Sequence, residues 1–132
     1  YKSYHILGAP SEFYGAYWHD SKYGVASYLS MDAKRGRKIW MWGLSRQGMI
    51  WEDLLTDKPA GQYVEIQAGR LFNQCRGESS FTPFKDREFA PYSTDLWTEY
   101  WMPVLDTGGF NAVSPAASMN VTVGQNKVDV AI

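Results

Sequence analysis

Apolar and polar residues alternate strictly along the segment 62–70. One side of an extended chain here carries Val64, Ile66 and Ala68, and the other carries Tyr63, Glu65 and Gln67. This period of two predicts a β-strand with its apolar face on a core. The opposite face presents a phenol, a carboxylate and a primary amide in a row. Because each of these groups can exchange hydrogen bonds with hydroxyls, the face suits a polyhydroxylated ligand.

Similar patterns continue along most of the chain, interrupted by turn residues. Strands are predicted over 13–18, 23–31, 38–44 and 96–104, and the C-terminal residues form a hairpin pattern over 119–123 and 127–132. The loop 32–36, with its glycine, is expected to join the second and third of these strands as a hairpin. The stretch 49–55 fits either a short strand or one helical turn. Since no amphipathic helix of normal length is visible, the pattern predicts an all-β fold.

The chain of 132 residues is long enough for one domain with a real core. We expect a β-domain over 1–108, a linker over 109–118 and a tail over 119–132. The tail is either a β-hairpin or the start of a following module. Because the chain begins at Tyr1 without an initiator methionine, we also expect it to be a piece of something longer.

Composition and charge argue against several classes of function. The net charge of −1 favours neither nucleic acid nor an anionic membrane as a partner. No apolar run approaches the roughly 20 residues of a membrane-spanning helix. Two histidines and one cysteine, widely spaced, offer no metal site of the usual ligand spacing, and no cofactor motif is visible. The basic run 34–38 is interpreted as a solvated loop rather than a nucleic-acid site.

Aromatic residues make up 16% of the chain, which indicates a thick β-core or ligand stacking. The segment 38–44 is apolar on both faces, with Ile39 and Met41 on one and Trp40, Trp42 and Leu44 on the other. A strand of this kind is usually covered on both sides, unless its aromatic face lines a binding groove. Trp40 and Trp42 are therefore candidates for stacking on a sugar.

Glu65 is the leading candidate for chemistry, as a general base, with Gln67 as a ligand for a hydroxyl. Walls of tryptophan and tyrosine could raise the pKa of a carboxylate by desolvation, which suits a base. The alternative is a solvated outer face of a half-buried strand, since exposed carboxylates on strands are common. Spacing alone favours that alternative.

Glu99 lies between Trp97 and Trp101 on one face of a predicted strand, in the manner of a sugar-binding platform. The alternative is that both tryptophans belong to the core and that an arginine pairs with the carboxylate. Glu65 and Glu99 could also flank a glycosidic bond as an acid and a base.

Two further polar candidates lie near strand ends. Arg70 could bind a pair of hydroxyls or a uronic carboxylate, and pairing with Asp53 or Asp57 is the alternative. His19 beside Asp20 offers an imidazole and a carboxylate, which a turn could bring into contact. The alternative for this pair is an ordinary surface loop.

The order of these motifs resembles the C-terminal part of the galactose-mutarotase-like superfamily. The residues that carry the resemblance are Tyr63-Val64-Glu65-Ile66-Gln67, Asn73, a Phe/Pro-rich loop and an aromatic strand with Thr98. By this resemblance Glu65 is the catalytic base, with Gln67 and Asn73 as its neighbours. Asp20 could correspond to a sugar-binding aspartate. The segment 68–72 departs from the superfamily's Pro-Asp loop, and no residue here matches its catalytic histidine, which lies in its first half.

The chain resembles more closely an uncharacterised domain family often found with tetratricopeptide repeats, over roughly residues 1–110. The matching motifs are Lys38-Ile39-Trp40-Met41-Trp42-Gly43, Trp51, Leu55-Thr56-Asp57, Tyr63-Val64-Glu65-Ile66-Gln67-Ala68-Gly69-Arg70 and Thr98-Glu99-Tyr100-Trp101-Met102-Pro103-Val104. The resemblance implies an antiparallel β-sandwich that is part of a galactose-mutarotase-like supersandwich, with 1–108 as its C-terminal portion. Its partners would be the N-terminal half of that domain or neighbouring repeats. An exposed apolar face could also make the chain a homodimer.

These features lead to the hypothesis of a carbohydrate-interacting domain in which Glu65 removes the proton of an anomeric hydroxyl, as in aldose 1-epimerases. The acid that protonates the ring oxygen would come from the other half, so this piece alone is expected to be inactive. One alternative is a non-catalytic glycan-binding module in which tryptophans stack on sugars. The other is a structural β-domain that packs against its missing half.

Overall fold

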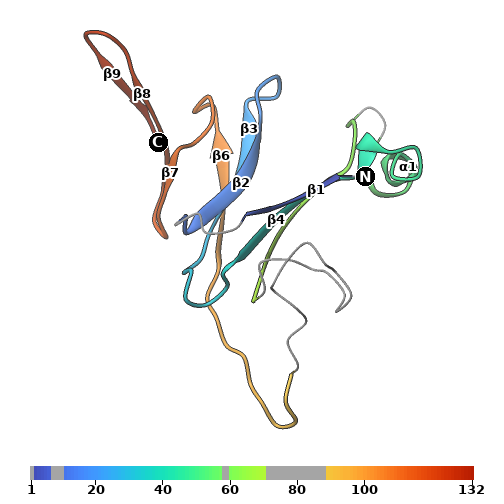
Figure 1. The fold of residues 1–132 in the computed structure, drawn as a ribbon. Helices are drawn as coiled ribbons and strands as arrows, with labels where there is room; N and C mark the ends of the chain where they lie inside the picture. Colours follow the sequence, from blue (N-terminus) through green and yellow to red (C-terminus); the bar gives the residue numbers. More distant parts are fainter. Residues whose placement is uncertain (1, 7–10, 58–59, 71–88) are drawn as a thin grey trace. The chain divides into compact units, whose positions relative to one another are not determined.

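A computed structural model describes residues 2–6, 11–57, 60–70 and 89–132 (Figure 1). The chain divides into two compact units, the first made of Tyr1–Ala9 and Lys34–Asp95 and the second of Pro10–Ala33 and Leu96–Ile132. In the described residues, nine strands form three sheets, and every strand pair is antiparallel. The prediction of an all-β fold is confirmed.

The first unit contains one three-stranded sheet in the order β1-β4-β5. Its strands are β1 (Lys2–Ile6), β4 (Gly36–Met41) and β5 (Val64–Gly69), and Figure 1 shows β4 alongside β1. The register places Trp40 opposite Glu65 and Lys38 opposite Gln67. Because directly opposed residues in an antiparallel pair point to the same face, these four side chains share one side of the sheet.

The chain leaves β4 through a short helical connection. A 3₁₀ helix (η1) occupies Trp42–Leu44, and α1 covers Ile50–Leu55, which settles 49–55 as a helical turn. Between them, the backbone N–H of Gly48 donates to both the carbonyl oxygen and the hydroxyl of Ser45, each at 3.0 Å. A β-carbon at position 48 would lie 1.8 Å from the Trp42 carbonyl oxygen, so this tight return requires glycine.

The expected hairpin across the loop 32–36 is wrong. The strand before this loop, β3 (Tyr23–Tyr28), is paired on both edges within the second unit, whereas β4 pairs with β1 and β5 in the first. The loop therefore passes the chain from one sheet to another. The interpretation of 34–38 as a solvated loop is also wrong, because Lys34, Arg37 and Lys38 are buried. The last two lie in β4, the central strand of its sheet.

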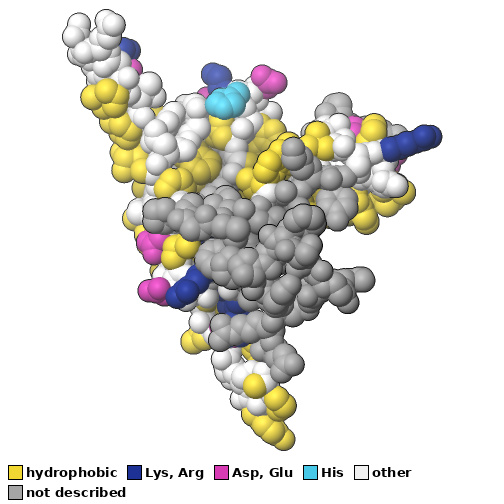
Figure 2. Space-filling view, viewed as in Figure 1, with side chains coloured by type: hydrophobic (Ala, Val, Ile, Leu, Met, Phe, Trp, Pro, Cys, Tyr) yellow, Lys and Arg dark blue, Asp and Glu magenta, His cyan; other side chains and the backbone are white. Residues whose placement is uncertain are grey.

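The second unit holds the other two sheets. One has the order β2-β3-β6, with β2 at Phe13–Trp18 and β6 at Tyr100–Leu105. The other is formed by β7 (Ala112–Val113), β8 (Ser118–Val123) and β9 (Val128–Ala131). The last two strands form a hairpin that carries hydrophobic side chains along part of its length (Figure 2). In the described part of the chain, no helix is long and apolar enough to span a membrane.

Part of the core of the second unit lies on the face of the β2-β3-β6 sheet that carries Ala26 and Val104, which are 0% and 1% exposed. On the same face, the ring of Phe13 meets that of Phe110 edge-on, with centroids 6.3 Å apart. Phe110 immediately precedes the third sheet, so this contact joins the two sheets of the unit. Gly15 lies beneath the same ring and permits the close approach.

Gly15→Ala is expected to lower the free energy of unfolding by about 2 kcal/mol, since overpacking a tight core typically costs this much. The new β-carbon would lie 2.1 Å from the Val25 carbonyl oxygen and 2.6 Å from Phe110 Cζ. Urea denaturation measures the effect. Gly124→Ala is the control, because its nearest neighbour is Lys127 Cγ at 3.4 Å. Equal stability of the two variants would contradict the packing described for Gly15.

Candidate functional site

Four of the residues predicted from the sequence lie together in the first unit. Trp40 and Trp42 come from β4 and the start of η1, and Glu65 and Gln67 come from β5. Pairing of Trp40 with Glu65 across the strands places Trp40, Glu65 and Gln67 on one face, and Trp42 reaches the same group through its hydrogen bond to Glu65. The alternation seen in the sequence is therefore sufficient to find this group. Trp42 belongs to it although β4 ends at Met41, one residue before it.

Hydrogen bonds connect these side chains in series. Trp42 Nε1 donates to Glu65 Oε2 at 3.2 Å, and Gln67 Nε2 donates to Glu65 Oε1. Trp40 Nε1 in turn donates to Gln67 Oε1 at 3.1 Å. Each oxygen of the carboxylate thus accepts one N–H and keeps lone-pair capacity for a further donor. Gln67 is held by Trp40 through its carbonyl and holds Glu65 through its amide N–H, which makes it a positioning residue in this arrangement.

Aromatic rings support the carboxylate. The rings of Trp40 and Trp42 stack, with centroids 5.7 Å apart and planes inclined by 14°. Trp51, from α1, meets Trp42 edge-on at 5.9 Å and 67°. Both geometries are favourable for aromatic pairs. Sequence reasoning did not select Trp51 as a site residue, because a lone tryptophan in a short helical turn carries no periodic signal that relates it to the strands.

A pocket of about 190 Å³ opens beside this group and belongs wholly to the first unit. Its lining residues are Trp42, Trp51, Leu55, Tyr63 and Glu65. Pockets for drug-sized ligands begin at roughly 300 Å³, so this volume suits a single small ring or the end of a longer ligand. The lining is mostly aromatic and apolar, with a phenol and a carboxylate as its polar groups.

Lys38 lies on the same face, opposite Gln67, and is 5% exposed. Burial lowers the pKa of its ammonium, and the neighbouring charge of Arg37 lowers it further. Gly69 leaves room for this ammonium, because a β-carbon there would lie 3.1 Å from Lys38 Nζ. Sequence reasoning began a strand at Lys38 but interpreted the basic run 34–38 as solvated, so it missed a charged residue on the candidate face.

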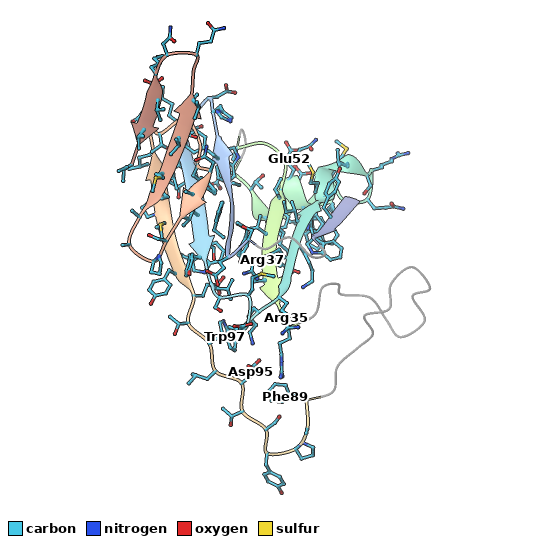
Figure 3. All side chains as sticks on the ribbon, turned by 60° about the vertical axis from the view of Figure 1, so that its left-hand side comes forward. Arg35, Arg37, Glu52, Phe89, Asp95 and Trp97 are labelled. Carbon is cyan, nitrogen blue, oxygen red and sulfur yellow. The ribbon has the colours of Figure 1, made fainter. Side chains whose placement is uncertain are left out.

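Arg70 takes part in a different group of the first unit. Its Nε lies 3.5 Å from Asp95 Oδ2, and its guanidinium lies 5.5 Å from the centre of the Phe89 ring. Asp95 also pairs with the ammonium of Lys34. Figure 3 shows Phe89 and Asp95 on the segment that precedes the second unit's β6 in the sequence. The described ion-pair partner of Arg70 is thus Asp95, rather than Asp53 or Asp57, and its role in ligand binding stays a prediction.

The second unit contains the predicted platform of Trp97, Glu99 and Trp101. Only Trp101 lies within β6, which begins at Tyr100. Oε1 of Glu99 accepts hydrogen bonds from the Tyr14 hydroxyl at 2.9 Å and the Ser27 hydroxyl at 3.0 Å. The Trp101 ring meets that of Tyr14 edge-on at 5.9 Å. Among the described contacts, two hydroxyls therefore hold Glu99 in place of the arginine considered from the sequence.

The remaining predicted residues lie elsewhere. Asp20 is exposed in the turn between β2 and β3, and Asn73 lies outside the described residues. Glu65 and Glu99 belong to different units, so their pairing across a glycosidic bond stays a prediction.

Comparison with known proteins places the chain in a family. No solved structure matches it. A family model described as "Domain of unknown function (DUF5107)" matches residues 1–104, which is well over half of the sequence. The match includes both β4 and β5, and with them the pocket and its carboxylate. The chain therefore belongs to the DUF5107 family of domains of unknown function.

Proposed function

We propose that this chain is a carbohydrate-interacting domain whose site is the pocket beside β4 and β5, with Glu65 as the group that meets the anomeric hydroxyl. The observation that carries the proposal is the position of Glu65. Its carboxylate lines a pocket walled by two indoles, and each of its oxygens is fixed by one N–H. This combines a flat apolar surface with an oriented hydrogen-bond acceptor.

A sugar ring presents the two kinds of surface that such a pocket can bind. Its C–H faces pack against aromatic rings, and its hydroxyls need hydrogen-bond partners. Trp42 and Trp51 supply the rings, while Glu65 and Tyr63 supply polar groups. The pocket volume of about 190 Å³ limits the buried part of the ligand to about one ring.

The same geometry supports a role for Glu65 as a general base. A base has to reach the proton that it removes and must be held in position. Trp42 and Gln67 orient the carboxylate while leaving acceptor capacity on both oxygens. The Glu-x-Gln pattern resembles that of galactose-mutarotase-like proteins, in which this glutamate is the base. The acid that protonates the ring oxygen would come from residues beyond this pocket.

Binding without turnover is the second candidate function, and the hydrogen bonds of Gln67 favour it. Its carbonyl is occupied by Trp40 and its amide by Glu65, so the face is already a connected network before any ligand arrives. Such a network suits a rigid binding surface as well as a catalytic one. Mutarotation measurements separate the two functions, because only a catalytic site accelerates the reaction.

Trp51→Phe is expected to weaken the binding of a responsive sugar about 2- to 10-fold, because an aromatic contact is worth roughly 0.5–1.5 kcal/mol. Tryptophan fluorescence titration with a panel of monosaccharides measures this effect on the wild type and the variant. Trp18→Phe is the matched control, since Trp18 is exposed in the second unit, where it stacks on Tyr23. No fluorescence response to any sugar, or equal loss in both variants, would count against the proposed site.

A further inference from the structure

Lys38 is a buried cation on the same face as Glu65, and the function proposed above makes no use of it. It is 5% exposed. Within the part of the chain that the structure describes, no hydrogen bond or ion pair engages its ammonium, which keeps some contact with solvent although the side chain around it is buried. Buried lysines are rare in proteins unless a counter-charge or hydrogen-bond acceptor accompanies them. An anion at this position would supply what the lysine lacks.

We propose that Lys38 forms an anion subsite, and that the saccharide bound on this face is an acidic oligosaccharide whose carboxylate, sulfate or phosphate meets the ammonium. This inference rests on the proposed function, because it names the class of sugar that the same face would bind. The neighbouring charges support it. Asp95 is paired with Lys34 and Arg70, so it does not serve as a counter-charge for Lys38 in the described contacts.

The strand register sets the length of such a ligand. Along the face, the pocket lies at the Tyr63 end, Glu65 follows, and Lys38 lies beyond it opposite Gln67. The ammonium reaches the vicinity of Gly69. Glu65 and Gly69 are four residues apart, which is roughly 13 Å at about 3.3 Å per residue. One sugar ring cannot fill the pocket and reach Lys38, so the ligand must contain at least two rings.

Gly69 has a specific part in this subsite. It lies in β5 opposite Gly36, so this pair of residues, the next on this face after Lys38 and Gln67, carries no side chain. A β-carbon at position 69 would lie 3.1 Å from Lys38 Nζ, closer than ordinary contact. Gly69→Ala would therefore crowd the position that the anion needs without removing any charge.

The experiment compares binding of trigalacturonic acid with that of galactotriose, which is neutral, by calorimetry. Wild type is expected to bind the acidic trimer at least tenfold more tightly, because hydrogen bonds to charged groups are strong. Lys38→Met should abolish this preference while neutral binding is retained, and Gly69→Ala should reduce it. Lys127→Met is the control, since it removes an equal charge from an exposed lysine.

Further probes identify the anionic group and distinguish a failure of the anion subsite from a failure of the proposed function. Trigalacturonic acid methyl ester should bind like galactotriose if a carboxylate is recognised, whereas a preference for sulfated or phosphorylated galactotriose would name those groups instead. Equal affinity of wild type for acidic and neutral trimers, or an acid preference that survives in Lys38→Met, would overturn the anion subsite and leave the proposed function intact. Absence of binding by every saccharide would overturn both.

Discussion

Glu65→Gln is expected to slow mutarotation of a responsive sugar by about 10²- to 10⁴-fold, the range that a positioned general base contributes. This corresponds to roughly 3–5 kcal/mol of activation free energy. The substitution keeps the shape of the side chain and one oxygen that can accept from Trp42 Nε1, but an amide cannot take up a proton. Polarimetry on freshly dissolved single anomers measures the rate. The sample is the full-length protein.

Glu52→Gln is the matched control for this prediction. Glu52 lies in α1 of the same unit, and it is not among the residues that line the pocket. A Glu65→Gln variant with the wild-type rate would show that Glu65 is not the base. If wild type itself gives no acceleration, while sugar binding survives in Glu65→Gln, the chain is a binding module without turnover.

The sequence pattern predicts the candidate face well because β4 and β5 obey the rule of alternation. Glu65 and Gln67 share a face by period two, and Trp40 joins them once the strands pair. The position of Trp51 follows from a different cause. It depends on the turn in which the backbone N–H of Gly48 donates to Ser45. This tight turn sets the direction in which the chain enters α1, and the spacing of hydrophobic residues does not encode that direction.

Strand pairing explains why the strand predicted over 96–104 begins later in the structure. Residues 96–99 alternate as well as those of β6, yet β6 begins at Tyr100. The register pairs Tyr100 with Tyr28, which is the last residue of β3, so the residues before Tyr100 have no strand alongside them. Alternation states which residues can form a strand, whereas the length of the neighbouring strand decides which of them do.

Burial of Lys34, Arg37 and Lys38 in the basic run 34–38 was beyond sequence reasoning for a related reason. A cluster of lysines and arginines after a turn ordinarily indicates solvent exposure. Here Arg37 and Lys38 lie in the central strand of a sheet, so neighbouring strands flank them on both edges. Their long aliphatic stems make such burial tolerable, while the charged ends need partners that only the tertiary structure reveals.

Asp95→Ala is expected to lower the free energy of unfolding by about 3 kcal/mol, at the low end of the cost of removing one partner from a buried ion pair. The side chain of Lys34 is 6% exposed and that of Asp95 is 22% exposed, so most of this pair is shielded from water. The contact with Arg70, whose side chain is 36% exposed, adds less because solvent screens it. Guanidinium denaturation measures the difference in the free energy of unfolding between the variant and the wild type. The dependence of that free energy on denaturant concentration should be the same for both proteins.

The control for Asp95→Ala is Asp129→Ala, which breaks an exposed pair with Lys127 and should change stability by no more than about 0.5 kcal/mol. Equal stability of the two variants would contradict the importance of the Lys34–Asp95 pair. The same variant also decides between the two roles considered for Arg70. If Asp95→Ala loses stability but retains sugar affinity at temperatures where it is folded, the interaction of Arg70 with Asp95 and Phe89 is structural. Loss of affinity in that folded variant would instead place Arg70 in the binding site.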